Sequence, residues 1–396
     1  MKKLCIVVQR YGNEIVGGSE SLTMQYAQKL KEYYDIEIIT TTCLDYNTLE
    51  NYYPAGLSEV DGIKVRRFET TKQKDSKGFD DIYIKQLESI RFGEPTTVKD
   101  NMEVIDAQGP YSPSMVEFIV NHGADYNAFM FMTYQYYPFV YALPYVAYKS
   151  AIVPTAHVDP MMELTIFRNL FCLPRFICYL TDEERLFVQK LFSNQFVKHN
   201  ITGVGIKPPE NISADVFKKM YNIDGKYILY LGRLDRAKGV DDLISFFKDY
   251  TIKYDSHIKL VLIGTGPLEI QNDENIVCAG YVDEQTKYSA IAGAEVTVCS
   301  SKYESLCMAL LEALALGVPA LVNGDCNVLK GHMIKSGAGL YYRSTESFSY
   351  ALHTLLTQTT KEREQMSKRA KDYVNNNYTW EKVIEKLRYA IDYVSM

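Results

Sequence analysis

The chain has 396 residues, and at about 150 residues per domain this length favours two or three domains. Its 43 Lys and Arg residues and 49 Asp and Glu residues give a formal charge of −6 without a long run of either sign, which disfavours a dedicated nucleic-acid binder. Hydrophobic residues at 47% and charged residues at 23% exclude a mainly disordered or fibrous chain, so we expect a folded, globular protein.

The cysteines indicate a reducing compartment. Cys5 and Cys299 lie within apolar runs, where a reduced thiol acts as a small hydrophobe. The eight cysteines form neither a CxxC pair nor a zinc-type spacing with histidine. We therefore predict a cytoplasmic protein without a metal site.

Residues 127–148 carry no charged side chain and are long enough to cross a bilayer. However, Pro138 and Pro144 interrupt the segment, and its first part is rich in tyrosine. A buried strand followed by a packed helix is therefore favoured over a transmembrane helix.

Short apolar runs rich in β-branched residues alternate with helical patterns, which is typical of βαβ units and a parallel sheet. The first series of predicted strands comprises residues 4–8, 36–41, 129–132, 151–154 and 176–180. The second series comprises residues 227–231, 259–263, 276–279, 295–299 and 320–322. We therefore expect an α/β protein with two Rossmann-like domains.

The predicted domain boundaries depend on two segments. Residues 203–209, with two glycines and two adjacent prolines, neither extend a helix nor pair well in a sheet, so we interpret them as an interdomain hinge. Beyond the second series, residues 379–396 place apolar side chains on one helical stripe. We predict an N-terminal domain over residues 1–204, a C-terminal domain over 205–378, and a helix over 379–396 that crosses back to the N-terminal domain.

The loop over residues 9–16, after the first predicted strand, leads into Gly17 and Gly18 and then into an amphipathic helical pattern. Paired glycines let the backbone approach a ligand closely, and a helix N-terminus offers amide groups to an anion. The alternative is an ordinary strand-to-helix turn with Ser19 as the N-cap. The sequence leaves both interpretations open.

Two glycine turns follow predicted strands of the second series. Gly232, Arg233 and Lys238 come after residues 227–231, at the carboxyl end of a strand, where open α/β sheets bind ligands. Two cations there suit a diphosphate, although a solvated basic turn is the alternative. Gly264 and Gly266 follow the next predicted strand without the third glycine of the dinucleotide fingerprint, which disfavours a hydride-transfer enzyme.

The most informative segment is residues 298–319, in which strand, loop and helix are all recognisable. Glu304 is predicted at the mouth of the helix and Glu312 about two turns inside, with the carboxylates on the order of 10 Å apart along the axis. That separation would span the ribose and the transferable sugar of a nucleotide sugar, with the diphosphate near the helix amides. Because an unpaired buried carboxylate is costly, Glu312 needs a partner such as ribose hydroxyls, and a salt bridge or partial exposure is the alternative.

These motifs resemble, in order and spacing, those of retaining GT-B glycosyltransferases of the family-4 (glycosyl transferases group 1) type. The resemblance implies two Rossmann-like domains facing across a cleft, the second binding a nucleotide diphosphate sugar without a metal or another cofactor. It assigns the diphosphate to Arg233 and Lys238, the ribose to Glu312 and the donor sugar to Glu304. The expected donor site comprises Gly17, Gly18, Gly232, Gly264, Gly266, Ser305, Leu306 and Glu312, and the expected catalytic residues in the second domain are Arg233, Lys238 and Glu304.

His157 follows a predicted strand of the first domain. In the family, a histidine in this position often faces the donor sugar, so the resemblance adds His157 to the expected catalytic residues, whereas the residue alone would pass for a structural histidine. Relatives often have an aspartate directly after this histidine, but here Val158 intervenes before Asp159. Residues 305–307 also replace a Gly-Phe-Gly run that follows Glu304 in many members, so the identity of the donor cannot be carried over.

The predicted function is the retaining, metal-independent transfer of a hexose-type sugar from a nucleotide diphosphate sugar to a glycan or lipid-linked glycan acceptor. The resemblance implies a role in surface polysaccharide biosynthesis, with peripheral association at the inner face of the membrane and no nucleic-acid partner. One alternative is a GT-B hydrolase or epimerase of nucleotide sugars. Another is a non-catalytic GT-B partner subunit, which the retained charges of the donor site disfavour.

Overall fold

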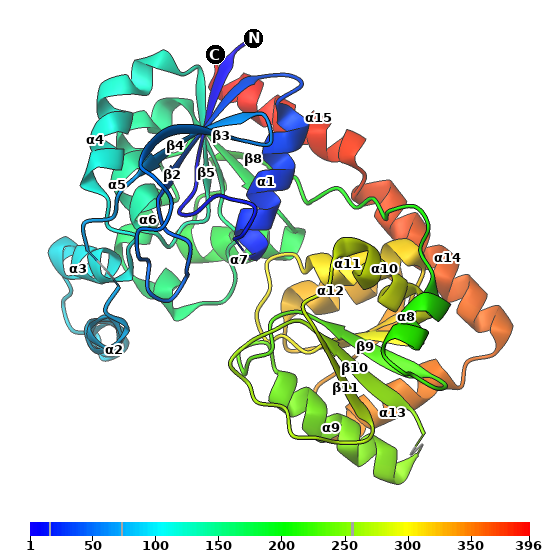
Figure 1. The fold of residues 1–396 in the computed structure, drawn as a ribbon. Coiled ribbons are helices and arrows are strands. Elements are labelled where there is room, and N and C mark those ends of the chain that lie inside the picture. Colours follow the sequence, from blue (N-terminus) through cyan, green and yellow to red (C-terminus); the bar gives the residue numbers. More distant parts are fainter. Residues whose placement is uncertain (16, 73, 255–256) are drawn as a thin grey trace. The chain divides into compact units, whose positions relative to one another are not determined.

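The computed structural model describes residues 1–15, 17–72, 74–254 and 257–396. These residues form two compact units, one made of Met1–Thr202 with Ile384–Met396 and the other of Gly203–Val383 (Figure 1). The first unit thus ends at Thr202 rather than at residue 204, and the C-terminal segment belongs to it from Ile384 onward rather than from residue 379. Each unit contains its own sheet.

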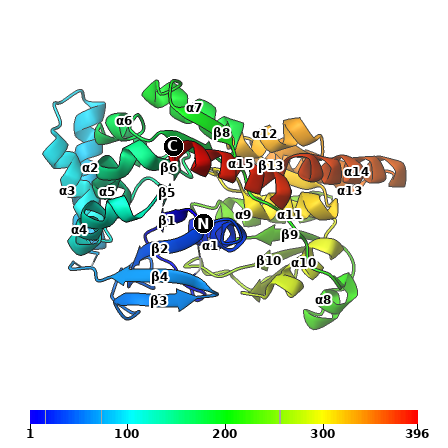
Figure 2. The ribbon, with the colours of Figure 1, turned by 90° about the horizontal axis from the view of Figure 1, so that it is seen from above.

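In the described part of the first unit, the sheet has eight strands in the order β3-β4-β2-β1-β5-β6-β7-β8. Its antiparallel pair is β3 with β4, which Figure 2 shows at one edge of the sheet, and the other neighbours are parallel. The strands are β1 (Lys3–Val7), β2 (Asp35–Thr41), β3 (Gly56–Val60), β4 (Ile63–Phe68), β5 (Ala128–Met132), β6 (Ser150–Val153), β7 (Phe176–Tyr179) and β8 (Lys198–Ile201).

The helices of the first unit connect these strands. They are α1 (Gly18–Leu30), α2 (Ser76–Arg91), α3 (Val98–Gln108), α4 (Pro113–His122), α5 (Tyr137–Val146), α6 (Ile166–Leu170), α7 (Asp182–Phe192) and, from its second turn onward, α15 (Trp380–Val394). Short 3-10 segments lie at Gly123–Asp125, Ala147–Lys149 and Pro160–Glu163.

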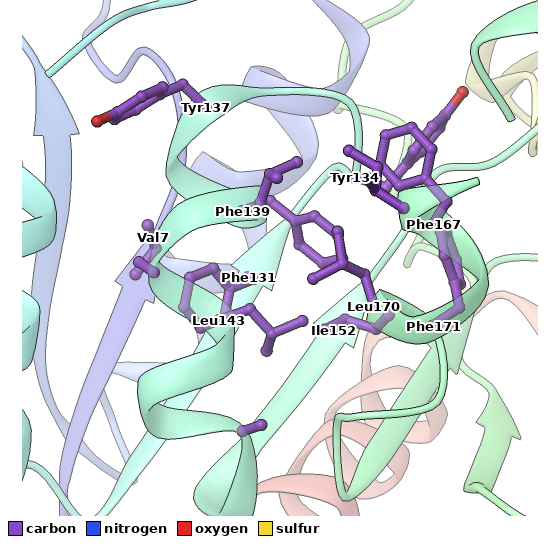
Figure 3. Packing of buried hydrophobic residues seen from close by; sticks show 14 of the residues in the cluster. Val7, Phe131, Tyr134, Tyr137, Phe139, Leu143, Ile152, Phe167, Leu170 and Phe171 are labelled. Carbon is purple, nitrogen blue, oxygen red and sulfur yellow. The ribbon is translucent and has the colours of Figure 1, made fainter. Parts of the chain in front are cut away.

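The uncharged residues 127–148 form β5 and α5, and most of their apolar side chains lie in the core of the first unit. Phe131 of β5 packs edge-on against Phe139 of α5 with ring centroids 6.3 Å apart, and Phe139 contacts Phe171 after α6 (Figure 3). Leu143 of α5 and Phe167 of α6 are fully buried in the same cluster. The prediction of a buried strand and a packed helix is confirmed, and no helix within the described ranges is long and apolar enough to cross a membrane.

Helix α15 packs onto the first unit through one apolar stripe. Phe176 of β7 contacts Tyr389 and Tyr393 with ring centroids 5.9 and 5.7 Å apart. An ion pair of 3.0 Å between Lys2 and Asp392 brings the two ends of the chain together, as Figure 1 also shows. The buried residues of the stripe in the first unit are Leu387, Ala390, Ile391 and Val394.

In the second unit, the described residues form a parallel six-stranded sheet in the order β11-β10-β9-β12-β13-β14. Its strands are β9 (Tyr227–Leu231), β10 (Lys259–Ile263), β11 (Ile276–Gly280), β12 (Val296–Cys299), β13 (Ala320–Asn323) and β14 (Gly339–Tyr342). Its helices are α8 (Ala214–Met220), α9 (Val240–Lys253), α10 (Glu284–Gly293), α11 (Met308–Leu316), α12 (Asn327–Ser336), α13 (Thr345–Leu356) and α14 (Thr360–Asn377).

The strand order of each sheet reverses at one point. In the second unit the chain leaves β9 toward β10 on one side and later places β12 on the other side, so the loops after β9 and β12 diverge from neighbouring strand ends. In open α/β sheets such a reversal point is the usual place for a ligand. The corresponding reversal in the first unit lies at β1, between β2 and β5.

Candidate functional site

Lys238 and Glu304 form the central contact at the reversal point of the second unit. Lys238 lies in the loop between β9 and α9, Glu304 lies between β12 and α11, and Lys238 Nζ is 2.7 Å from Glu304 Oε1. The two side chains are 33% and 15% exposed, so the ion pair is partly shielded but reachable from solvent. Burial opposes the charge of Lys238, but the adjacent carboxylate of Glu304 outweighs it and raises the pKa of Lys238, which is therefore cationic at neutral pH.

Arg233, the second predicted cation, is folded back onto its own loop. Its guanidinium pairs with Asp235, whose other carboxylate oxygen accepts a hydrogen bond of 2.8 Å from the backbone amide of Lys238. The Arg233 side chain is 58% exposed. Both predicted diphosphate-binding cations are thus held near the same strand end, each paired with a carboxylate of this site.

The glycines after β10 pack against the loop after β9. A Cβ on Gly264 would lie 2.0 Å from the carbonyl oxygen of Gly232, and one on Gly266 would lie 2.2 Å from that of Leu234. The amide of Leu234 donates to the carbonyl of Thr265 at 3.0 Å. Loop packing alone therefore requires glycine at 264 and 266, and a donor contact by Gly232, Gly264 or Gly266 stays a prediction.

Glu312 lies closer to the helix start than its sequence position suggested. Helix α11 begins at Met308, so Glu312 is its fifth residue, little more than one turn inside instead of two. Its carboxylate lies 2.6 Å from Nζ of Lys287 on α10, which is the salt-bridged alternative raised for this residue. Burial raises the pKa of Glu312, whereas the charge of Lys287 acts in the opposite direction. A ribose contact by Glu312 stays a prediction.

Residues 304–307 are termed the donor loop here, because the resemblance assigns Glu304 to the donor sugar. A histidine that the sequence did not indicate forms a hydrogen bond to the backbone of this loop. His332 of α12 is fully buried, and its Nε2 lies 2.9 Å from the carbonyl oxygen of Leu306. In the sequence, His332 is not spaced from other residues as metal ligands or catalytic triads are, so no sequence pattern predicted this contact. The side chain of Leu306 is also buried, whereas Ser305 is partly exposed.

In the first unit, Gly17 and Gly18 precede a buried carboxylate. Helix α1 begins at Gly18 with Gly17 at the N-cap position, so Ser19 lies inside the helix and its interpretation as the N-cap is wrong. Glu20 in the first turn is buried, pairs with Arg10, and would lie 2.3 Å from a Cβ on Gly17. This helix start therefore already has a negative charge beside it.

The loop expected over residues 9–16 is described through residue 15, and Val16 lies outside the described residues. Gly18 has open space where a Cβ would be. The prediction that Gly17 and Gly18 approach the donor is neither supported nor opposed by these contacts.

His157 lies after β6, with its Nε2 3.9 Å from Oδ2 of Asp159. The imidazole is 33% exposed, and the other oxygen of Asp159 accepts a hydrogen bond of 2.8 Å from the amide of Met161. Asp159 thus caps the 3-10 segment that follows while it faces the imidazole. The loop is tied to α7 by Glu184, which accepts a hydrogen bond from the amide of Ala156.

Comparison with known proteins defines the class of the fold. Over 100% of this chain and 99% of the other, the structure is similar to sucrose-phosphate synthase from Thermosynechococcus elongatus, with a TM-score of 0.71 and 14% identity. At this identity the similarity establishes the fold alone. The protein has the GT-B architecture of glycosyltransferases, as the resemblance implied.

The family follows from the sequence of the second unit. Residues 211–373, which lie within the second unit, match the family Glycosyl transferases group 1. Over 175 residues the chain is 26% identical to an uncharacterized glycosyltransferase of Methanocaldococcus jannaschii, covering 41% of this chain and 44% of the relative. Over 222 residues it is 28% identical to the amylovoran biosynthesis glycosyltransferase AmsD of Erwinia amylovora, covering 52% and 61%. The chain thus spans about half the length of the curated relatives it matches.

Proposed function

We propose that the protein is a retaining hexosyltransferase that uses a nucleotide diphosphate sugar and a glycan or lipid-linked glycan acceptor. The observation that carries the proposal is the contact between Lys238 and Glu304 at the reversal point of a group 1 glycosyltransferase domain. The similarity to a relative named for amylovoran biosynthesis supports surface polysaccharide as the product class.

In this proposal the diphosphate binds beside Lys238 and Arg233. A phosphate oxygen would replace the carboxylate partners of both cations, and the strongly charged hydrogen bonds formed would compensate for those exchanged. Release of Glu304 from Lys238 would free its carboxylate to face the sugar, where positive charge develops in the transition state. Glu312, whose carboxylate also pairs with Lys287, would hold the ribose.

The proposed reaction is a front-face displacement that needs no metal. The acceptor hydroxyl oxygen forms a bond to the anomeric carbon while the bond from that carbon to the diphosphate oxygen breaks on the same side. The departing phosphate oxygen takes the acceptor proton, and Lys238 and Arg233 stabilise its remaining charge. His157 in the first unit is proposed to face the donor sugar, and the acceptor is proposed to lie against that unit.

A panel of nucleotide diphosphate sugars, incubated with and without glycan acceptors, tests the proposal. We expect release of nucleoside diphosphate that depends on an acceptor, and a product whose new linkage keeps the anomeric configuration of the donor. Release at the same rate without any acceptor would favour a hydrolase, and interconversion of the sugar would favour an epimerase. Donor binding without any turnover across the panel would favour a non-catalytic subunit.

A further inference from the structure

We propose that His332 is a positioning residue that couples the donor loop to the segment joining the two units, through a hydrogen-bonded relay inside the second unit. The relay runs through Leu306, His332, Tyr373, Tyr378 and Ile206. The idea that a donor operates this relay rests on the proposed function, whereas the relay itself rests on the contacts given below.

The first link holds the donor loop. The carbonyl of Leu306 can only accept a hydrogen bond, so Nε2 of His332, 2.9 Å away, must carry the proton. The remaining ring nitrogen, Nδ1, is then an acceptor, and the hydroxyl of Tyr373 donates to it at 2.8 Å. Burial lowers the pKa of His332 to about 4, which agrees with a neutral ring that uses one nitrogen as donor and the other as acceptor.

The second link extends the relay along α14. Because the hydroxyl of Tyr373 donates to His332, it accepts from the hydroxyl of Tyr378, 3.4 Å away. The ring of Tyr378 also lies against His332 and Tyr373, with centroids 6.0 and 5.6 Å apart. His332 and Tyr378 are buried, so water cannot readily replace these partners. All hydroxyl and N–H donors of the relay therefore point toward the donor loop.

The third link reaches the connection between the units. The chain passes from the first unit to the second at Thr202–Gly203 and returns at Val383–Ile384. Shortly after the first passage, the amide of Ile206 donates to the carbonyl of Tyr378 at 2.7 Å. The neighbouring Gly205 packs against the indole of Trp380, where a Cβ would lie 2.3 Å from the ring. Residues 203–206, which we term the connection segment, are thus attached to the same turn that carries Tyr378.

These links give the donor loop and the connection segment a common set of partners. A shift of the Leu306 carbonyl breaks its bond to His332, and reorientation of the imidazole then changes the bonds of Tyr373 and Tyr378 in turn, because the hydrogen bonds of a side-chain network orient and polarise one another. A ligand that orders the donor loop therefore also orders the connection segment. By linkage, the state of the connection segment affects ligand affinity to the same degree.

Amide hydrogen exchange of the full chain tests the relay without a ligand. His332→Phe replaces the imidazole by a slightly larger aromatic ring that makes neither hydrogen bond. We expect the amide of Ile206 and the amides of residues 304–308 to exchange about fivefold faster or more, as for the loss of one hydrogen bond. The matched control is His353→Phe, since the ring of His353 in α13 also contacts a tyrosine ring of this unit, that of Tyr254. Faster exchange at the donor loop with unchanged exchange at Ile206 would overturn the relay.

Tyr373→Phe provides a second test if His332→Phe does not fold, because it removes one hydroxyl and leaves the imidazole in place. We expect Tyr373→Phe to speed amide exchange both at Ile206 and at the donor loop. His332→Gln keeps an N–H donor, so we expect it to restore slow exchange at the donor loop more than at Ile206. Unchanged exchange at both segments in Tyr373→Phe would refute the proposal.

A ligand arm separates this proposal from the proposed function. UDP and GDP serve as probes, and the one that binds should slow exchange at both segments in the wild type but only at the donor loop in His332→Phe. If neither probe binds, the proposed function is in error while the ligand-free test of the relay still stands. If a probe slows exchange at the connection segment equally in both proteins, the coupling does not run through His332.

Discussion

The carboxyl group of Glu184 lies between two strand ends and holds the residue next to His157. One of its oxygens accepts a hydrogen bond of 2.5 Å from the amide of Ala156, and the other accepts one of 2.5 Å from the amide of Leu180. These amides follow β6 and β7, so a single buried side chain of α7 ties both loops together. The geometry of the His157 loop therefore depends on a group that sequence inspection would assign to an ordinary helix start.

Glu184 should make stability depend on pH near neutrality. Burial raises its pKa from 4.5 to about 8, although the amides of Leu180, Ala156 and Thr181 act in the opposite direction. Between these values the unfolded state loses the proton and the folded state keeps it, so stability falls as pH rises, by up to about 1.4 kcal/mol per pH unit. Thermal unfolding across this range should show a steeper decline for the wild type than for Glu184→Gln. Parallel curves of stability against pH for the two proteins would contradict the raised pKa of Glu184.

His332 should give the opposite dependence at lower pH. Its folded pKa is about 4 against an ordinary value of 6.5, so its contribution to stability is complete above about 6.5 and is lost as pH falls toward 4. We expect the melting temperature of the wild type to drop over this interval more than that of His332→Gln, with His353→Gln as the control for loss of a histidine. If the melting temperature of the wild type falls no more than that of His332→Gln, the buried ring is not neutral.

Turnover should persist in the presence of EDTA. Lys238 and Arg233 supply the positive charge at the proposed diphosphate site, so neutralising the departing diphosphate needs no divalent cation in this proposal. Chelation should leave the initial rate within error of the untreated enzyme. A rate that collapses with EDTA and returns with magnesium or manganese would require a different model of the diphosphate site.

The two glutamates should differ in what they bind. Glu312→Gln should weaken nucleoside diphosphate binding by about tenfold to a hundredfold, because a charged hydrogen bond to ribose contributes about 1.5 to 3 kcal/mol. Glu304→Gln should keep or improve that binding, since it removes the carboxylate that Lys238 otherwise contacts, while lowering turnover. Calorimetric titration of both variants separates these outcomes.

Lys287→Gln is the matched control for Glu312, because it removes the same salt bridge from the other side. If Lys287→Gln weakens binding as much as Glu312→Gln, the effect comes from the salt bridge and not from a ribose contact. A loss of affinity in Glu304→Gln with none in Glu312→Gln would reverse the assignment of the pair.

The predictable part of the fold consists of its strands with apolar runs, which are largely buried except for the edge strand β11. β9 and β10 have the predicted bounds, and the other predicted strands lie within one residue of theirs, because strands covered on both faces are continuous apolar runs. The strands that were missed are β3, β4, β8 and β14, which lie at or next to sheet edges. β3 is exposed along most of its length, and β8 has the sequence Lys-His-Asn-Ile. β4 alternates apolar and basic residues only over its first four residues, 63–66, which is a short period-2 pattern.

The candidate site was predictable only where it follows strand ends. Lys238 and Glu304 both follow strands, and the rule for parallel sheets is sufficient to bring them to one edge. Lys287 and His332 lie on helix faces, and their partners Glu312 and Leu306 are 25 and 26 residues away. These contacts depend on how helices pack on one another, which local sequence patterns do not specify.

We propose that a nucleoside diphosphate binds beside Lys238, and calorimetric titration of Lys238→Gln measures the loss of this contact. Lys302→Gln is the control, because Lys302 lies in the same loop as Glu304 but pairs with Asp242 at 3.1 Å instead. We expect that whichever of UDP and GDP binds the wild type loses about tenfold to a hundredfold in affinity for Lys238→Gln and keeps its affinity for Lys302→Gln. Equal affinity for the wild type and Lys238→Gln would contradict the claim.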